Sequence, residues 1–240
     1  VAKDAAGNRS KLTFVLHGAT AAEAAAWPRS KENGQLFRWS ETNDLMGNGL
    51  HFSLPPNALY DDTRIQCRTT PSLAKAYAPV YEVQDEKTPL QLAGTIRIDV
   101  TKDVPQGKTD KLLVVKLLNG KPSPEGGTYA NGTVTARVRT FGDFTVMLDT
   151  TPPVLIPIDL HADMKGRSGF RIKVGDNLSG LEQWKATLDG QWILLEYDPM
   201  RGDLEHTFDI QSFLPGIHLL NVEAIEERGG RTSLTRRFTR

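Results

Sequence analysis

"WKATLDGQWILL", residues 184–195, places an Asp-Gly pair between two runs of alternating side chains. An Asp-Gly pair in such a pattern is typical of a two-residue type I′ hairpin turn. The turn pairs Leu188 with Gln191 and Ala186 with Ile193, and paired residues share one face of the ladder. The inward face of the predicted hairpin then carries Trp184, Ala186, Leu188, Ile193 and Leu195. The stretch predicts an antiparallel sheet with one buried face.

The same alternation turns Trp192 and Leu194 outward, beside Lys185. Burial of such large apolar groups stabilises a protein by about 1.5–3 kcal/mol each, so their position on a solvent face is unexpected. We therefore expect these three residues to form an interface. The favoured partner is the preceding domain, docked across the linker between the two domains. The alternative partner is a glycan strand that stacks on the indole.

Strand patterns continue on both sides of this hairpin, through residues 150–240. Short runs bounded by Gly, Pro, Asn and Asp are predicted to be strands at 154–160, 169–176, 182–188, 191–197, 204–210, 217–226 and 231–239. About seven antiparallel strands in a segment of this length are typical of an immunoglobulin-like or fibronectin-like sandwich. Before them, "DTTPPV" (149–154) holds two prolines that cannot donate to a ladder, which predicts a domain seam.

Residues 30–149 carry a second series of strand patterns. They lie in "GLHFSLPP", "TRIQCRTT", "VYEVQ", "GTIRIDV", "KLLVVKLL", "GTVTARVR" and "DFTVMLD". They predict a middle β-sandwich, so the predicted fold class is all-β with two sandwich domains. Cys67 alternates with Ile65 and Thr69 and is expected to be a small buried thiol on one strand face. The alanine-rich residues 19–29 are expected to be a linker.

The first residues resemble the end of a domain. "GNRSKLTF" (7–14) indicates a hairpin turn that leads into a half-buried strand. A shift of 222 positions lays residues 2–13 over residues 224–235, with Ala, Gly, Arg, Leu and Thr matched. We interpret residues 1–18 as the last strand of a truncated immunoglobulin-like module. This segment, with its apolar side chains Leu12, Phe14 and Leu16, is expected to add to an exposed sheet edge of the middle sandwich or of a neighbouring molecule. The alternative is a disordered end.

Composition excludes several classes of function. Lys plus Arg and Asp plus Glu each number 29, so the formal net charge is zero and nothing attracts nucleic acid on charge alone. The chain has no apolar stretch of 18 residues, so no membrane insertion is predicted. The single cysteine excludes an internal disulfide.

No catalytic or cofactor site is predicted either. The five histidines, His17, His51, His161, His206 and His218, lack both the H-x-x-x-D and the H-x-H spacing of a peptidase zinc site. "QGKT" (106–109) lacks the first glycine of a phosphate loop. Arg201-Gly202-Asp203 is a candidate surface motif, because this tripeptide is a known integrin ligand. The favoured interpretation is a hairpin turn that uses the conformational freedom of Gly202.

Four longer stretches carry a resemblance to a known family: "FSLPPNALYDD" (52–62), "RTFGDFTVMLDTTPPV" (139–154), "DNLSGLEQWKATLDGQWILLEYDP" (176–199) and "GIHLLNVEAIEERGG" (216–230). In this order they resemble the C-terminal non-catalytic tail of secreted lysostaphin-like metallopeptidases of Gram-negative gut and oral bacteria. "SLPPNAL" (53–59) by itself also resembles the sandwich of ankyrin-type proteins. The resemblance implies a zinc peptidoglycan endopeptidase domain upstream. It also implies a secreted, periplasmic or outer-membrane-associated location.

Two functions are compatible with these observations. In the first, the sandwiches are the structural and targeting tail of a cell-wall peptidase, with the protein's own upstream domains and the cell envelope as partners. In the second, they form a surface adhesion or carbohydrate-binding module, with Trp192, Tyr197 or Arg201-Gly202-Asp203 at the contact. The sequence identifies neither the polymer nor the protein that is bound.

Overall fold

The computed structural model describes residues 2, 3, 5–13, 15, 18, 20, 33–208 and 215–240. In this part of the chain the regular structure is β-strand throughout, apart from one turn of 3₁₀ helix at Thr109–Lys111. All named strand pairs are antiparallel, and no sheet closes into a barrel. The predicted all-β fold class is confirmed. Residues 34–240 form one compact unit with two hydrophobic cores, and residues 1–33 form a second unit.

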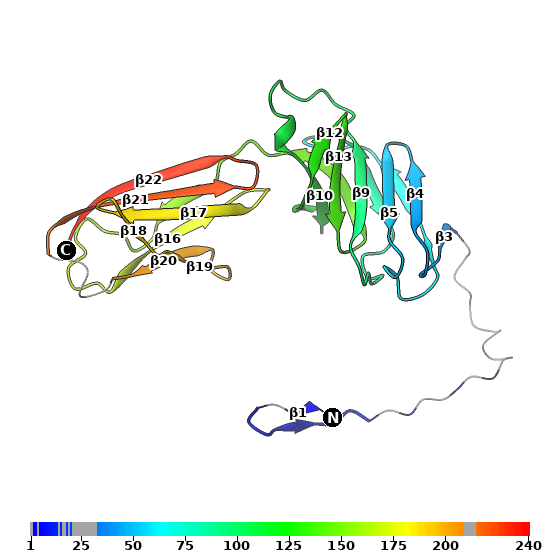
Figure 1. The fold of residues 1–240 in the computed structure, drawn as a ribbon, viewed down its shortest axis with the longest axis horizontal. Helices are drawn as coiled ribbons and strands as arrows, with labels where there is room; N and C mark the ends of the chain where they lie inside the picture. Colours follow the sequence, from blue (N-terminus) through cyan, green and yellow to red (C-terminus); the bar gives the residue numbers. More distant parts are fainter. Residues whose placement is uncertain are drawn as a thin grey trace. The chain divides into compact units, whose positions relative to one another are not determined.

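The middle sandwich, residues 34–149, consists of two five-stranded sheets and a short strand pair (Figure 1). One sheet has the order β12 (Thr128–Ala130), β13 (Thr133–Val138), β9 (Gly94–Asp99), β5 (Leu50–Leu54) and β4 (Asn43–Gly47). The other has the order β11 (Lys121–Gly126), β10 (Leu112–Leu118), β14 (Gly142–Leu148), β8 (Val80–Val83) and β7 (Cys67–Thr70). The short pair is β3 (Gln35–Phe37) with β6 (Thr63–Ile65).

Alternation along the strands builds the core between these sheets. Phe52 pairs with Ile96 and Ile96 with Ala136 across β5, β9 and β13, and all three are buried. Phe144 and Tyr81, partners on β14 and β8, are buried from the opposite sheet. The period of two in the sequence therefore becomes one apolar layer, as sheet geometry requires.

The middle sandwich differs from the sequence prediction at one broken strand, at Cys67 and at four strands that were not predicted, β3, β4, β11 and β12. The expected strand 63–70 breaks at Gln66, because β6 pairs with β3 and β7 with β8. Alternation does not continue through that change of sheet, so Cys67 is exposed although Ile65 is buried, and the expectation of a buried thiol is wrong. Strand β11 was not predicted because it contains Pro122 and Pro124, which a strand tolerates at a sheet edge.

The C-terminal sandwich, residues 150–240, consists of two four-stranded sheets (Figure 1). One has the order β15 (Val154–Pro157), β16 (Gly169–Gly175), β20 (Asp203–Thr207) and β19 (Glu196–Asp198). The other has the order β18 (Gln191–Ile193), β17 (Leu181–Leu188), β21 (Ile217–Glu226) and β22 (Arg231–Thr239). The expected single strand 191–197 is therefore two strands, β18 and β19, which lie in different sheets.

Loops of the C-terminal sandwich contact the middle sandwich at its loops and at the outer side of its strands β10 and β14. The backbone N–H of Ser179 donates to Oδ2 of Asp149 at 2.8 Å, and Nη1 of Arg228 donates to the carbonyl of Gly127 at 2.9 Å. Leu178 packs in a small apolar cluster with Val115 and other side chains of β10 and β14. The seam predicted at "DTTPPV" thus holds a buried carboxylate, Asp149, that fixes a loop of the following sandwich.

The N-terminal hairpin repeats the register of the C-terminal one. Strands β1 (Ala2–Lys3) and β2 (Arg9–Ser10) pair Ala2 with Ser10, and the residues 222 positions later, Ala224 and Thr232, pair in the same way. The predicted hairpin turn is confirmed by this ladder and by the positive φ of Gly7, +88°. Leu12 follows the end of β2 and is exposed. Phe14 and Leu16 of the expected strand, and most of the expected linker at 19–29, lie outside the described residues.

Two glycines of β16 provide a test of this packing. A Cβ at Gly169 would lie 2.1 Å from the carbonyl oxygen of His206 on β20, whereas a Cβ at Gly175 would meet nothing closer than 4.0 Å. We expect Gly169→Ala to lower the free energy of unfolding by about 2 kcal/mol or more, because two paired backbones would have to separate. Gly175→Ala, the control, should change it by less than about 1 kcal/mol. Urea unfolding measures both, and equal effects would contradict the close approach of β16 and β20.

Candidate functional site

The outward side of the sheet β18-β17-β21-β22 carries a row of side chains that crosses all four strands. Trp192 on β18 pairs with Thr187 on β17, and Thr187 pairs with Asn221 on β21. Asn221 in turn pairs with Thr235 on β22. We call this outward side, with Lys185, Glu223 and Ser233 in the next row, the Trp192 face. Figure 1 shows the four strands side by side.

The inward and outward assignments of the predicted hairpin are confirmed. Ala186, Leu188 and Ile193 are buried in the core, in the register that the Asp-Gly turn predicted. Asp189 and Gly190 have φ of +53° and +83°, as a type I′ turn requires. Trp184 is half-buried, and its indole N–H donates to the carbonyl of Leu195 at 3.1 Å.

The expected covering of Trp192 by the preceding domain is wrong. Trp192 is 69% exposed and Leu194 is 54% exposed, and Lys185 is exposed beside them. The middle sandwich contacts the C-terminal sandwich through Leu178, Ser179 and other loop residues. Because the C-terminal sandwich makes these contacts with its loops, the outward side of its sheet β18-β17-β21-β22 is left uncovered. The indole therefore remains available to another molecule.

The Trp192 face has a shallow hollow of about 380 Å³, and one of its lining residues, Thr187, is the ladder partner of Trp192. Its walls include Thr187, Asn221, Ser233 and Thr235, which offer neutral hydroxyl and amide groups. The Thr235 hydroxyl donates to Oδ1 of Asn221 at 2.8 Å, so this amide is held in one orientation with its nitrogen as a remaining donor. The hollow thus offers neutral hydrogen-bonding groups, of which the Asn221 amide is held in place by Thr235.

The hollow is also lined by two charged side chains, Lys185 and Glu223, which are paired with each other. Lys185 Nζ lies 2.7 Å from Glu223 Oε2, and Arg231 Nη1 lies 3.5 Å from Glu223 Oε1. The hydrogen bond from Lys185, with the attraction of both cations, holds the pKa of Glu223 below its usual value. The carboxylate stays ionised near neutral pH, so these three groups do not compete for a ligand.

The turn that positions Trp192 is itself held by side-chain contacts. Asp189 Oδ1 accepts the backbone N–H of Leu219 at 2.7 Å, and Asp189 Oδ2 lies 2.6 Å from Nδ1 of His218. The contact with His218, followed by the bond from Leu219, lowers the pKa of Asp189. The hairpin β17–β18 is therefore attached to β21 at its tip as well as along its ladder.

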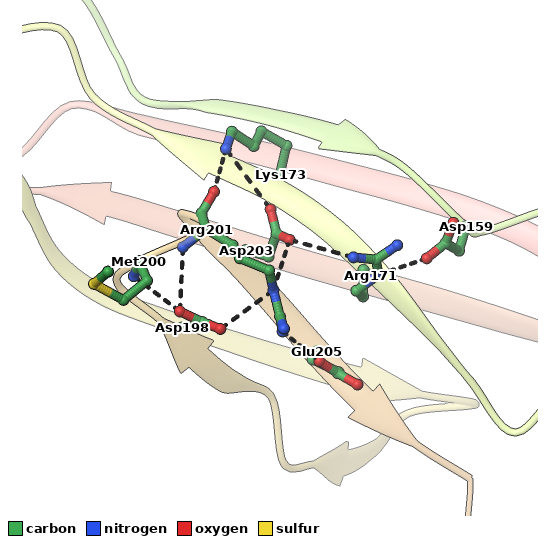
Figure 2. Close-up of polar contacts among 8 residues, drawn as sticks. All are labelled: Asp159, Arg171, Lys173, Asp198, Met200, Arg201, Asp203 and Glu205. Carbon is green, nitrogen blue, oxygen red and sulfur yellow. Dashed lines mark hydrogen bonds and ion pairs between the residues drawn. The ribbon is translucent and has the colours of Figure 1, made fainter.

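The second candidate motif, Arg201-Gly202-Asp203, is not displayed for recognition. Asp203 is only 4% exposed, and its carboxylate lies 3.3 Å from Nε of Arg201 and 3.8 Å from both Nη1 of Arg171 and Nζ of Lys173 (Figure 2). A ligand of the integrin type must offer its carboxylate to the partner. Here three cations of the same sheet surround it.

The turn interpretation of this motif is confirmed. Gly202 has φ of +65°, and its N–H donates to the carbonyl of Asp198 at 2.7 Å across the turn between β19 and β20. Arg201 also contacts Asp198 and Glu205, and Arg171 contacts Asp159, which extends the network (Figure 2). These charges join the turn to β16.

The Trp192 face contains residues that the sequence interpretation missed. Asn221 and Thr235 lie on β21 and β22, far from the Asp-Gly turn in sequence, and the alternation of those strands alone could have indicated that they face outward. Their alignment with Trp192 depends on the register between strands, which a single strand pattern does not contain. In the described part of the chain, no group of three or more His, Cys, Asp or Glu side chains is placed to hold a metal ion. No helix among the described residues is long and apolar enough to cross a membrane.

One comparison with known proteins gives a match. Residues 34–149 match the model of the Zu5-like domain family. This range begins just before β3 and ends just after β14, so it covers the middle sandwich and leaves out the C-terminal sandwich with the Trp192 face. No curated protein matches the chain. The middle sandwich is thus similar to this domain type, and the match does not reach the Trp192 face.

The buried carboxylate of Asp203 gives a stability prediction. Asp203→Asn should lower the free energy of unfolding by about 1–3 kcal/mol, because three cations would lose the anion that they share. Glu205→Gln, in the same network but partly exposed and paired with Arg201 alone, should cost less than about 1 kcal/mol. Urea unfolding of both variants measures the difference. An Asp203→Asn variant as stable as Glu205→Gln would show that the network contributes nothing to stability.

Asp189 gives a pH-dependent prediction. Because its pKa is lowered in the folded state, its stabilising contribution is complete above the unfolded value of about 4 and is lost as the pH falls below that value. Asp189→Asn keeps a residue that tolerates positive φ but removes the charge. The variant should be less stable at pH 7 by up to about 1 kcal/mol, since the side chain is half exposed. The difference in the free energy of unfolding between wild type and variant should become smaller as the pH falls towards 3. Urea unfolding of both proteins at several pH values measures it, and a difference that does not change with pH would contradict this role.

Proposed function

We propose that this chain is a non-catalytic region that binds cell-envelope glycan through the Trp192 face, as the targeting tail of a secreted cell-wall metallopeptidase. The observation that carries the binding role is the exposed Trp192 at the end of a row of fixed hydroxyl and amide groups. The resemblance of four stretches of sequence to such tails supports the peptidase context. The catalytic zinc domain would precede this chain.

Sugar chemistry matches the groups on this face. A sugar ring has one apolar C–H face and a rim of hydroxyl groups. The indole offers a large apolar surface for the ring face, while Thr187 and Asn221 offer partners for the rim. The sheet also fixes the spacing of these groups, because neighbouring strands lie about 4.8 Å apart.

The middle sandwich has a supporting role in this proposal. Asp149 and Gly127 hold loops of the C-terminal sandwich through hydrogen bonds from Ser179 and Arg228. These contacts leave the Trp192 face uncovered. The middle sandwich would then act as a spacer between the glycan-binding sheet and the upstream catalytic domain.

A surface adhesion or carbohydrate-binding module without an enzyme is the second candidate. The shared register of the hairpins at 2–10 and 224–232 favours it, since repeated sandwich modules suit an extended surface protein. In both cases the Trp192 face is the contact surface. A gene sequence that places H-x-x-x-D and H-x-H motifs upstream would favour the peptidase tail over the adhesin.

The test of the binding role is the affinity of the full chain for glycan after Trp192→Ala. Loss of a stacked indole should weaken binding to soluble peptidoglycan strands roughly tenfold or more, from about 1.5–3 kcal/mol of lost burial. Trp39→Ala is the matched control, because Trp39 is also a partly exposed tryptophan but lies on the middle sandwich. It should leave the affinity unchanged. Wild-type affinity in Trp192→Ala, measured by calorimetry, would contradict the proposal.

A further inference from the structure

Arg237 lies on the Trp192 face, next to the polar row. It is two residues from Thr235 on β22, so both side chains point to the same side of the sheet, while the neighbouring Phe238 is buried in the core. Its cross-strand partner is Leu219 on β21. The Arg237 side chain is exposed and makes no ion pair or hydrogen bond with any described residue.

The carboxylates around Arg237 are already engaged. Glu223 lies two rows further along β21, since Asn221 separates it from Leu219, and it is paired with Lys185 and Arg231. Asp189 at the tip of the hairpin contacts His218 and the N–H of Leu219. Arg237 therefore remains the one guanidinium on the described Trp192 face whose charge is not balanced by a neighbour.

We propose that Arg237 binds a carboxylate of the glycan that occupies the Trp192 face, so that the ligand is an acidic rather than a neutral glycan. This inference rests on the proposed function. A guanidinium matches a carboxylate with two parallel N–H donors, and the bond is stronger than one between neutral groups. The neutral row Thr187–Asn221–Thr235 then binds the sugar hydroxyls, and Arg237 selects for charge.

The strand spacing also sets the length of the ligand. Trp192 and Arg237 lie on the outer strands of a four-stranded sheet, three strand spacings apart. Arg237 is also two residues further along β22 than Thr235, which lies in the row of Trp192. At about 4.8 Å per strand and 3.4 Å per residue, the Cα atoms of the two residues are roughly 16 Å apart. A ligand that lies along the polar row from the indole to Arg237 must cover this distance, which is longer than one sugar ring. The ligand is therefore an oligosaccharide whose carboxylate lies some sugars away from the ring on the indole.

Two glycans that differ only in charge test the inference on the full chain. One is a soluble strand of alternating N-acetylglucosamine and N-acetylmuramic acid with free lactyl carboxylates, and the other is the same strand with those groups amidated. The wild type should prefer the free carboxylates about fivefold at low salt, the upper range for an exposed ion pair. Higher salt should reduce the preference. Arg237→Gln should remove this preference by weakening the binding of the strand with free carboxylates.

Arg236→Gln is the matched control, because Arg236 is the neighbouring exposed arginine on β22 and its position alternates to the opposite side of the sheet. It should retain the preference. Equal binding of both strands by the wild type, with Trp192→Ala still weakened, would overturn the inference and leave the proposed function intact. Loss of the preference in Arg236→Gln as well would also overturn it, since strand charge in general would then be the cause. No effect of Trp192→Ala on either strand would overturn the proposed function and the inference with it.

Discussion

The register fixed by the Asp189-Gly190 turn is the constraint on which the candidate site depends. Two consecutive residues with positive φ give a turn of the type I′ hand, and this turn pairs Leu188 with Gln191. A shift of one residue would move every side chain of β18 to the other face of the sheet. Trp192 would then enter the core and Ile193 would face solvent. The exposure of the indole is therefore a consequence of the turn, and the contacts of Asp189 with β21 hold that turn in place.

Buried carboxylates in and beside the C-terminal sandwich mainly join one strand or loop to another. Asp203 joins β20 to Arg171 and Lys173 of β16, and Asp149 fixes the loop that carries Ser179. Each of these carboxylates is buried, and each is satisfied by cations or N–H groups, which is what a low-dielectric site requires. A motif that looks like a surface ligand in the sequence is thus a structural network. Arg237 differs because no described carboxylate neutralises it.

Local patterns predicted much of the fold, and two of the failures share a physical cause. The hairpin faces and most strands followed from alternation and turn chemistry, both of which act over a few residues. The predictions failed where the chain changes sheet within one apparent strand, at Gln66 and between Ile193 and Glu196. There the partner strands, not the local pattern, decide which side is buried. The alignment of Asn221 and Thr235 with Trp192 likewise depends on the registers of three ladders, β18–β17, β17–β21 and β21–β22. The candidate site therefore depends on them too.

The equivalent hairpins at residues 2–10 and 224–232 show which features depend on the local sequence and which depend on distant strands. Their ladders have the same register, although Gly7-Asn8 stands in one turn and Gly229-Gly230 in the other. Yet Leu234 is 8% exposed, whereas Leu12, its equivalent 222 positions earlier, is 81% exposed. Turn chemistry is therefore sufficient to set the pairing, but burial needs the opposite sheet, which the C-terminal sandwich supplies through Phe170, Ile172 and Leu204. The Trp192 face depends on the same two factors. The turn and the ladders determine which residues lie side by side on it. Its apolar surface is exposed because no further layer of the described chain packs on it.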